Sequence, residues 1–485
     1  MYDERYPRPT RRPVFERESE PMTGDTILVE SAYETLEEEM HGDVLRPGDG
    51  GYDEAREVWN AMIDKHPAVI TRCAGTADVI TSVNVAREHD LPIGVKGNGH
   101  NVAGNAVCDD GLTIDLSGMT AVRVDPTSRT ARVEPGATLA DVDHETQAFG
   151  LATPLGFVSE TGIAGLTLGG GFGYLSRTYG MTVDNLRSVD VVTADGELLH
   201  ASEDERPDLF WALRGGGGNF GIVTSFEFDL HEVGPEVLAG LIIHRAEDAH
   251  EVVRHWRDYV AEIPDELTVW VVVLTAPPAP FIPEAHHGEP VVAVLPIYAG
   301  DLDDGWSLVE PLLEFGDPLG DNVAVRSYAK WQQFFDAANA SGSRNYWKSL
   351  NFTEFTDEMI DTALEYGLSR PTDDTKYAMA HMGGAMSRVP VDETAYPHRD
   401  TEFLVNVQVR WDDPEQDEEC VEWAGESHDA LVEYSTDGTY MNFISEETGR
   451  ERFAYRENYD RLVEVKTEYD PENVFRLNQN VTPAT

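Results

Sequence analysis

The chain has 485 residues with an apolar share of 41%, which is long enough for two or three domains with sizeable cores. It carries 89 acidic against 36 basic residues, a formal net charge of −53. No basic stripe exists to neutralise phosphates, so we expect no nucleic-acid partner. We also expect no membrane span, because no apolar run reaches 18 residues.

The acidic charge is distributed along the whole chain, and only six lysines occur. This pattern resembles that of proteins from salt-in halophiles. In molar salt the Debye length falls to about 3 Å, which would relieve the self-repulsion of such a surface. The sequence therefore predicts a halophilic protein.

The cysteines and the N-terminus indicate a cytoplasmic location. Cys73, Cys108 and Cys420 are odd in number and far apart, which argues against a disulfide framework or a zinc site. Arg11-Arg12 is followed by the charged stretch Pro13 to Glu20, so the hydrophobic segment of a secretion signal is missing.

The first half of the chain predicts a mixed α+β unit after an irregular, acidic segment over residues 1–55. A helix is predicted from Ala77 to Glu88, with Thr76 as its cap, and another after Thr138 with Leu139, Val142 and Phe149 on one face. The predicted strands are Ala68–Arg72, Leu91–Val95, Gly111–Leu116, Ala121–Val124 and Thr130–Val133.

A glycine-rich loop from Val95 to Asn105 follows one of these strands. Its glycines allow sharp turns and close approach of a ligand, and a run of free N–H groups in such a loop suits a pyrophosphate. His100 lies in the middle, and a neutral imidazole is a nucleophile near pH 7. It could therefore become covalently attached to a bound dinucleotide. The alternative is a surface turn with an incidental histidine.

Two more glycine segments follow, Gly162–Gly173 and Gly215–Gly221. The first contains no charged residue and could lie against the flat face of a large ring; the alternative is a tightly packed buried loop. The second opens onto an alternating strand, Ile222–Leu230, and a hairpin is predicted over Ser188–Ala201 with a turn at Asp195-Gly196. Three glycine loops suit an extended dinucleotide better than a mononucleotide.

The pattern changes near Gly234-Pro235, where we place a domain boundary. The second half predicts an antiparallel sheet covered by helices, and a further periodic helix begins near Asn458. The expected strands are Leu267–Leu274, Val291–Pro296 and Phe403–Trp411, and the expected helices are Asp248–Ile263, Thr356–Gly367 and Glu418–Leu431. One further helix, Asp208–Leu213, is expected before the boundary.

The three glycine segments and the terminal run Tyr469–Arg476 together resemble the vanillyl-alcohol-oxidase-type FAD proteins, in their berberine-bridge-enzyme-like branch. The resemblance runs from about Pro67 to the C-terminus. It implies an α+β fold with a two-part, PCMH-type FAD-binding domain made of mixed α/β subdomains from both chain ends, with an inserted substrate domain. The expected bounds are 56–235 for the FAD domain, 236–440 for the substrate domain and 441–485 for the returning C-terminal segment.

The resemblance also implies roles for individual residues. His100 matches the histidine that bonds the flavin 8α-methyl carbon, and Asn478 matches an asparagine near the flavin ring. Thr161 matches the position that guards oxygen's approach to the flavin, and its small size favours O2 as electron acceptor. The remaining expected FAD contacts are Gly97, Asn98, Gly99 and Asn101 in the pyrophosphate loop, Gly162, Gly165, Thr167, Gly169 and Gly170 in the second glycine segment, and Ile222 and Val223 near the adenine.

The sequence departs from the family pattern at three positions. Many relatives have a second covalent link through a cysteine where this chain has Val158, so we expect a single link through His100. Phe172 replaces a tyrosine found in some relatives, and Asn406 stands where some have Glu or Gln. Tyr440 is the candidate proton acceptor, in a segment that resembles a strand returning to the flavin.

The function that follows is an FAD-dependent oxidoreductase acting on a hydroxyl or C–N group of a small organic substrate, possibly a sugar. Hydride would pass to the flavin, which O2 or another acceptor would reoxidise. Two alternatives stay open here. One is a non-catalytic flavin- or nucleotide-binding protein that kept the fold; the other is an NAD(P) Rossmann dehydrogenase, which lacks support because no glycine loop opens a βαβ unit with an acidic residue about 20 positions on.

Overall fold

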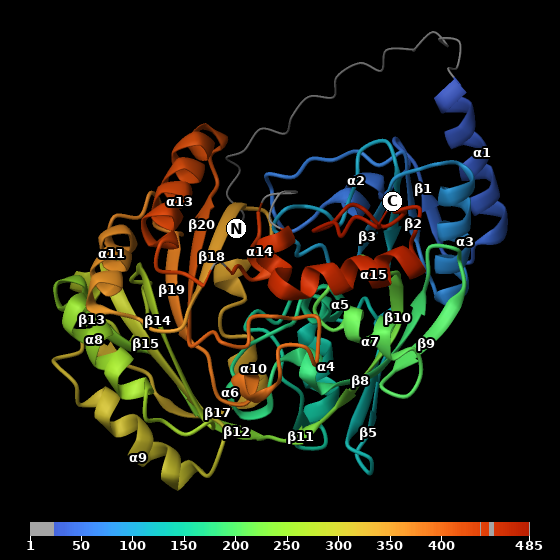
Figure 1. Cartoon of the computed structure of the whole chain (residues 1–485). Helices are drawn as coiled ribbons and strands as arrows, with labels where there is room; N and C mark the ends of the chain where they lie inside the picture. The colour runs from blue at the N-terminus through green and yellow to red at the C-terminus, as the bar shows by residue number, and fades with distance from the viewer. Residues whose placement is uncertain (1–23, 437, 446–450, 485) are drawn as a thin grey trace, which may run out of the picture.

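The computed structural model describes residues 24–436, 438–445 and 451–484. Two domains lie side by side (Figure 1). The split domain comprises residues 24–233 and 441–484, so it is formed by both ends of the chain, and the inserted domain comprises residues 236–436. Among the described residues, no helix has both the length and the apolarity needed to cross a bilayer.

The first sheet of the split domain has four strands in the order β1-β2-β4-β3. Parallel pairing of β2 and β3 with β4 buries a core of aliphatic side chains, which α3 covers. The elements are β1 (Asp43–Leu45), β2 (Val69–Arg72), α3 (Thr76–Glu88), β3 (Ile93–Lys96) and β4 (Leu112–Asp115).

The expectation of an irregular segment over residues 1–55 is wrong where the structure describes it. Helix α1 (Gly24–Glu39) buries Ala32 and Leu36 in the core beneath α3, and β1 extends the sheet. The apolar positions of α1, such as Val29, Ala32 and Leu36, do follow helical spacing, but five glutamates give the same stretch the acidic composition of an irregular segment. Residues 1–23 lie outside the described part of the chain.

The second sheet of the split domain has five antiparallel strands in the order β5-β6-β10-β8-β9. Strand β10 alternates buried and half-buried residues, and Phe226 and Phe228 fill the core that α7 and α15 close. A capping box between Thr138 and Asp141 starts α4. The elements are β5 (Val122–Asp125), β6 (Thr130–Val133), α4 (Leu139–Gln147), β8 (Leu186–Val192), β9 (Leu198–Ser202), α7 (Pro207–Leu213), β10 (Ile222–Asp229) and α15 (Tyr459–Tyr469).

The inserted domain is built on a nine-stranded antiparallel sheet, with the main order β16-β13-β15-β14-β19-β20-β18 and β12 and β17 paired at its side. Helices α8, α9, α11 and α13 cover the outer face (Figure 1). The strands are β12 (Glu236–Ala239), β13 (Ile242–Arg245), β14 (Leu267–Thr275), β15 (Pro290–Tyr298), β16 (Gly320–Asp321), β17 (Ala324–Ser327), β18 (Arg344–Phe352), β19 (Lys376–His381) and β20 (Phe403–Trp411). The four helices are α8 (Ala249–Val260), α9 (Leu302–Leu313), α11 (Asp357–Leu368) and α13 (Asp417–Val432).

Short elements connect these layers. The remaining helices and strands are α2 (Tyr52–Arg56), β7 (Leu151–Ala152), α5 (Ile163–Leu168), α6 (Ser176–Tyr179), β11 (His231–Glu232), α10 (Tyr328–Gln332), α12 (Ala385–Arg388) and α14 (Glu451–Tyr455), with single 3-10 turns at Thr182–Asn185, Ala246–Asp248, Glu284–His286, Ala337–Asn339, Pro414–Gln416, Met441–Phe443 and Arg456–Asn458. The segment Gly162–Gly173 is therefore not a loop throughout, because its Ile, Leu and Thr residues form α5.

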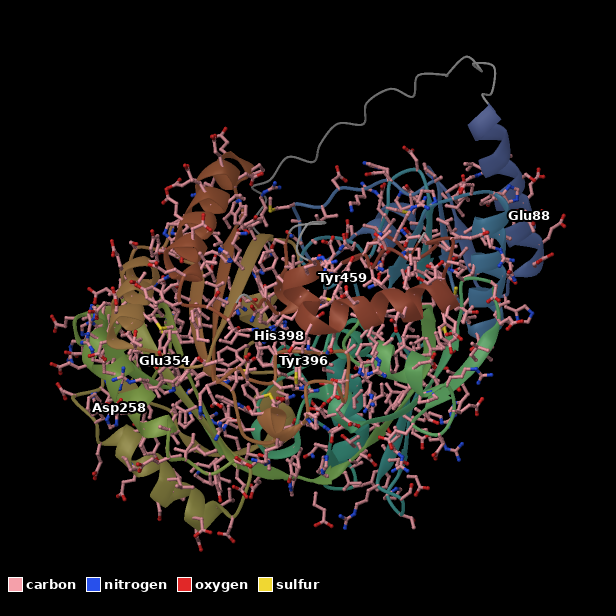
Figure 2. All side chains as sticks on the ribbon, viewed as in Figure 1. Glu88, Asp258, Glu354, Tyr396, His398 and Tyr459 are labelled. Atoms are coloured by element: carbon pink, nitrogen blue, oxygen red, sulfur yellow. The ribbon has the colours of Figure 1, made fainter. Side chains whose placement is uncertain are left out.

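The inner face of the nine-stranded sheet packs on the split domain through one shared core. Trp270, Trp347 and Leu404 from the sheet pack in the same cluster as Trp59 and Phe172 from the split domain. In Figure 2, Tyr396 and His398 lie in this central region, whereas Asp258 and Glu354 lie over the outer helices and Glu88 over the far side of the split domain. The functional cavity is part of this junction.

Candidate active site

A long cavity lies between the two domains and encloses about 1760 Å³ of empty space including its opening. All three glycine segments contribute to its wall, together with the 3-10 turn after Tyr440 and the C-terminal residues 475–479. The wall thus combines segments from both ends of the chain. An elongated, mostly apolar space of this kind suits a dinucleotide with a large ring system.

His100 lies in the wall of the cavity, in the loop that follows β3. The turn requires Gly99, whose φ is +71°, and the Trp59 N–H donates to the Gly99 carbonyl at 3.0 Å. The Trp59 ring stacks on the imidazole with a centroid distance of 5.7 Å and an interplanar angle of 18°. Burial lowers the pKa of His100 to about 4. The imidazole is consequently neutral near pH 7 and available as a nucleophile.

The same loop presents free polar groups to the cavity. The Asn98 side chain donates to the Gly136 carbonyl at 3.1 Å, while its buried Oδ1 has no partner among the described residues. A Cβ on Gly162 would lie 2.3 Å from that Oδ1, so only glycine fits there. Asn101 closes the loop by accepting the Asn105 N–H at 3.0 Å. The donors that suit the pyrophosphate of FAD are the backbone N–H groups of this glycine-rich loop, because the free Asn98 oxygen can only accept a hydrogen bond.

Small residues keep the next part of the wall open. A Cβ on Gly165 or Gly218 would meet no atom within 4 Å, so both leave space for a ligand. Thr161, Gly162, Gly165 and Gly169 line the cavity, as do Ile222, Val223 and Asn478 further along. The Asn478 side chain donates to the Gly218 carbonyl at 3.0 Å, which ties the C-terminal segment to the third glycine loop. A flat ring system fits against this wall.

Thr167 and Gly170, both expected to contact FAD, are placed differently. Neither lines the cavity. Thr167 lies fully buried within α5, and a Cβ on Gly170 would point to Met181 and the Tyr396 ring, each at 3.0 Å. The helical turn of α5, which the glycine pattern does not reveal, directs these two residues to the back of the wall.

Tyr440 lies in the cavity wall with its hydroxyl surrounded by donors. Its oxygen accepts hydrogen bonds from the Gly171 N–H at 3.0 Å and from the Asn442 side-chain amide at 2.9 Å. The ring packs edge-on against Phe172 and Phe443. Burial outweighs the two donors and raises the pKa of Tyr440 to about 12. Tyr440 caps a 3-10 turn, so the expectation of a strand here is wrong.

Asn406 is close to this region but does not line the cavity. It lies on β20, paired with Ser349 on one side and Ala378 on the other. The Ser349 hydroxyl accepts a hydrogen bond from the Tyr440 backbone N–H at 3.2 Å. Asn406 lies on the neighbouring strand, directly beside Ser349. Asn406 is 2% exposed, and neither atom of its amide has a partner among the described residues.

Several residues of the wall are not in the predicted set. Asn442 lies two residues after Tyr440, in the segment that resembles a strand returning to the flavin, and Gly217 and Gly218 belong to the third glycine segment, so their sequence signals were present. Trp59 and Trp347 gave no signal, because each lies in a segment without a recognisable motif. Val158 lines the cavity, whereas none of the three cysteines does; all three are buried and free. Within the described residues, no group of three or more His, Cys, Asp or Glu could hold a metal.

Comparison with known proteins agrees with this geometry. The FAD binding domain family matches residues 67–202, and the berberine and berberine-like family matches residues 439–482. The chain is 32% identical to (R)-6-hydroxynicotine oxidase of Paenarthrobacter nicotinovorans over 92% of this chain and 97% of that protein. It is 31% identical to an FAD-linked oxidoreductase of Dictyostelium discoideum, over 96% and 99% of the two chains.

Solved structures share the whole fold. The crystal structure of 6-hydroxy-D-nicotine oxidase from Arthrobacter nicotinovorans superposes with a TM-score of 0.82 at 31% identity, covering 92% of this chain and 98% of that one. Xylooligosaccharide oxidase from Myceliophthora thermophila, solved with xylobiose, gives a TM-score of 0.81 at 25% identity, covering 94% and 100%.

The split domain and its cavity thus define a flavin-dependent oxidoreductase, as the sequence predicted. The chain belongs to the FAD-linked oxidoreductases of the vanillyl-alcohol-oxidase family, with the berberine-like C-terminus. The predicted fold class and FAD cofactor are confirmed. The Rossmann alternative is excluded by the family match.

Proposed function

We propose that this protein holds FAD through a single covalent bond to His100 and oxidises a CH–OH or CH–NH group of a small organic molecule. The observation that carries the proposal is the neutral, desolvated imidazole of His100 in the glycine loop of the cavity wall. FAD supplies the electron chemistry by accepting a hydride. Relatives named as nicotine and xylooligosaccharide oxidases support both substrate chemistries without deciding between them.

The protein's own residues divide the remaining tasks. Trp59 stacks on His100 and would hold the plane of the imidazole that carries the flavin. Asn98 and the glycine loop bind the pyrophosphate. The aromatic rings of Phe172 and Phe443 pack around Tyr440 and exclude water from the part of the cavity beside its hydroxyl. Val158 occupies the wall position where many relatives have cysteine, so the proposal includes no second bond.

Tyr440 handles the substrate proton. An alcohol must lose its O–H proton as hydride leaves the carbon, which requires a base in reach. The donors Gly171 N–H and Asn442 stabilise the phenolate form, although burial leaves the hydroxyl protonated at neutral pH. A neutral amine needs no such base. We therefore propose that Tyr440 is the base for an alcohol and a positioning hydroxyl for an amine.

The covalent link is tested by denaturing the protein in acid and separating protein from flavin. Flavin absorbance should stay with the wild-type polypeptide and should be released from His100→Ala, which should still bind FAD. His66→Ala is the matched control, because His66 is exposed and outside the cavity. Complete release of flavin from the wild-type protein would disprove the covalent link.

Catalysis is tested separately from flavin attachment. Anaerobic mixing with a panel of alcohols, sugars and cyclic amines should bleach the oxidised flavin spectrum for at least one class. A flavin that no member of the panel reduces, but that dithionite does, would favour the non-catalytic alternative. The amount of hydrogen peroxide formed in air per molecule of substrate oxidised then tests whether O2 is the electron acceptor. The small side chain of Thr161 favours O2.

A further inference from the structure

The inner face of the nine-stranded sheet carries a polar row beside the flavin cavity. The register aligns Trp347 of β18 with Gln408 of β20 and Lys376 of β19. Alternation along β20 places Arg410 on this same face, two residues beyond Gln408. Trp347 itself lines the cavity. The row therefore leads from the cavity wall across the sheet to two cations.

Solvent reaches the sheet at this place. Val272, Ala378 and Lys376 are only partly buried, although they lie on central strands and their sequence neighbours are fully buried. Val272 pairs with Ala378, and Ala378 pairs with Asn406. Lys376, Ala378 and Val272 therefore form a partly exposed strip beside Asn406, whose unpartnered amide is itself buried.

Lys376 and Arg410 lie close together under the segment that contains Asn339, a residue of the cavity wall. The Lys376 ammonium donates to the Ala338 carbonyl at 2.9 Å, and the Arg410 guanidinium donates to the Ala340 carbonyl. The guanidinium also lies 5.9 Å above the Trp59 ring, which stacks on His100. The cation pair is thus one aromatic ring away from the flavin attachment point.

The two cations lack a counter-charge. Among the described residues neither forms an ion pair with a carboxylate, in a chain with 89 acidic residues. The acids whose charge acts on them, Asp374 and Asp412, are exposed. Burial, and secondarily the charge of Arg410, lower the pKa of Lys376 to about 8. A buried arginine beside a partly buried lysine is unfavourable unless an anion offsets the two charges.

Unpartnered polar atoms, both donors and acceptors, occur on residues of this part of the sheet. One terminal nitrogen of Arg410, the indole N–H of Trp347 and both amide atoms of Asn406 are buried without partners among the described residues. Arg410 is 8% exposed and Asn406 2%. Buried polar groups are normally hydrogen-bonded, so this concentration of unpaired groups indicates a site that a polar ligand completes.

We propose that Lys376 and Arg410 bind a carboxylate of the substrate, so that the enzyme acts on small organic acids that carry a hydroxyl or amine. This inference deepens the proposed function and rests on it. Ser349, whose hydroxyl accepts the Tyr440 backbone N–H, lies on β18, and Lys376 lies on β19, with β20 between them. At ordinary spacings the two residues are separated by about 10 Å across the strands and about 7 Å along them. The oxidised carbon and the carboxylate would lie at opposite ends of a compact molecule.

A purely structural role for the cations makes a different prediction. If they only hold the Ala338 and Ala340 carbonyls, they should confer no preference between charged and neutral ligands. Benzoate and benzamide are suitable probes, because they share their shape and differ in charge. Binding of each to the flavin-containing protein is measured by titration calorimetry at pH 7 and constant ionic strength.

Benzoate should bind at least about tenfold more tightly than benzamide to the wild-type protein. Lys376→Gln should abolish this preference, and Lys376→Arg, which keeps the charge, should retain it. Lys330→Gln is the matched control, because Lys330 is exposed on α10. If Lys376→Gln does not fold, benzoate affinity of the wild-type protein should still fall as pH rises through about 8, while benzamide affinity stays constant.

Equal binding of the two probes to the wild-type protein would overturn the inference, as would a preference that survives both Lys376→Gln and Arg410→Gln. Neither result depends on turnover. If the protein prefers benzoate but no substrate reduces its flavin, the anion site would be supported and the proposed function contradicted. If a substrate reduces the flavin but the protein does not prefer benzoate, the proposed function would be supported and the anion site contradicted.

Discussion

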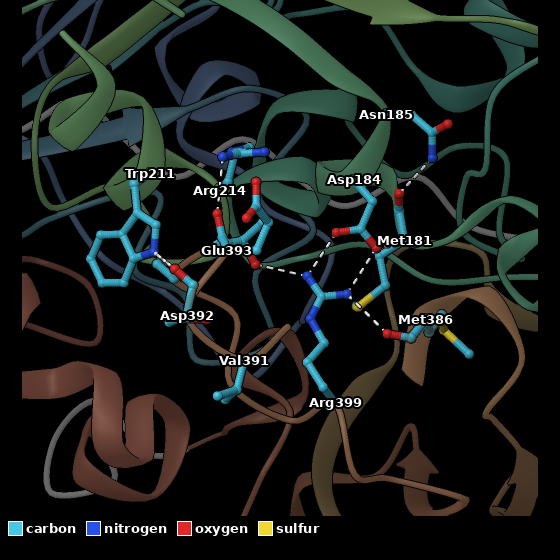
Figure 3. Close-up of polar contacts among 12 residues, drawn as sticks. Met181, Asp184, Asn185, Trp211, Arg214, Met386, Val391, Asp392, Glu393 and Arg399 are labelled. Carbon is cyan, nitrogen blue, oxygen red and sulfur yellow. Dashed lines mark hydrogen bonds and ion pairs between the residues drawn. The ribbon is translucent and has the colours of Figure 1, made fainter. Parts of the chain in front are cut away.

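Arg399 holds Asp184 in a two-pronged ion pair that joins the two domains. The two terminal nitrogens of the guanidinium donate to the two carboxylate oxygens at 2.8 and 2.7 Å, and both side chains are buried (Figure 3). Arg399 also donates to the Thr394 hydroxyl, and Asp184 accepts the Met181 N–H at 2.8 Å. Met181 and Tyr396, neighbours of this pair in sequence, both pack against Gly170 behind the cavity wall.

The first prediction concerns this ion pair. Arg399→Met should lower the free energy of unfolding by about 3–5 kcal/mol, because Asp184 is left buried and charged without its partner. Arg388→Met removes an exposed arginine paired with Asp265 and should cost at most about 1 kcal/mol. Denaturant unfolding of the two variants measures the difference. Equal losses of unfolding free energy in the two variants would show that the buried ion pair contributes no more stability than the exposed one.

The second prediction concerns the pH at which flavin attaches. With a pKa of about 4, His100 stays neutral from pH 8 down to about pH 5, so the attachment rate in apoprotein mixed with FAD should be constant over that range. An ordinary histidine with a pKa of about 6.5 would be about 3% neutral at pH 5 and would slow roughly thirtyfold. Acid-quenched time points of protein-bound flavin distinguish these two outcomes.

The same shift has a consequence for stability. Because the folded pKa of His100 is lowered, the unfolded state binds the proton first as the pH falls. The contribution of neutral His100 to stability is therefore complete above about pH 6.5 and is lost as the pH falls from there toward about 4. His100→Gln, which cannot ionise, should show a shallower loss of stability across this window in thermal melts.

The third prediction concerns Tyr440. With an alcohol substrate, Tyr440→Phe should slow anaerobic flavin reduction at least about 100-fold, the lower end for loss of a general base, with FAD content unchanged. Tyr396→Phe is the control, since its ring lies 6.3 Å from that of Tyr440. Because the pKa of Tyr440 is about 12, the wild-type rate should rise about tenfold per pH unit between pH 7 and 9. A flat profile would assign the base elsewhere.

The fourth prediction concerns space for the cofactor. Gly165→Leu should sharply reduce FAD content, because its side chain would enter the open cavity rather than meet protein atoms. Gly425→Leu in α13 also meets no atom within 4 Å but lies outside the cavity, so it should leave FAD content unchanged. The ratio of flavin to protein absorbance gives the answer. Full FAD occupancy in Gly165→Leu would place the cofactor elsewhere.

The fifth prediction concerns salt. A net charge of −53 should raise the melting temperature and FAD retention between 0.1 M and 2 M KCl, because the Debye length shortens from about 10 Å to below 3 Å. Sucrose of matched viscosity serves as the uncharged control. A midpoint that does not move with KCl would contradict the expectation of a halophilic protein.

The sequence allowed much of the fold and part of the site to be predicted. Regular periodicity located helices such as α3 and α11 and the whole of β20, and the glycine loops placed His100 correctly in the cavity wall. Strands β18 and β19 were missed, and they carry Trp347 and Lys376. Their inner faces, which pack toward the split domain, mix aromatic, charged and small residues, and this mixture disrupts the alternation that marks an ordinary strand.

The orientation of side chains at the back of the site was harder to predict. Thr167 lies in the short helix α5, and Gly170 follows this helix and faces Met181 and the ring of the distant Tyr396. Trp59 acquires its role only through the fold, which brings it from the N-terminal region onto His100 and next to Arg410. Such positions depend on contacts across hundreds of residues, which local patterns do not encode.

The last contacts of the split domain have a consequence for synthesis of the protein. The Asn219 side chain donates to the Gln479 carbonyl, and the Asn478 side chain donates to Gly218, each across 260 positions. Domains generally fold as their residues leave the ribosome. Here the glycine loops emerge early, but the cavity stays incomplete until Asn478 and Gln479 have been synthesised. A chain that stalls before Asn478 is made would thus lack a closed flavin site.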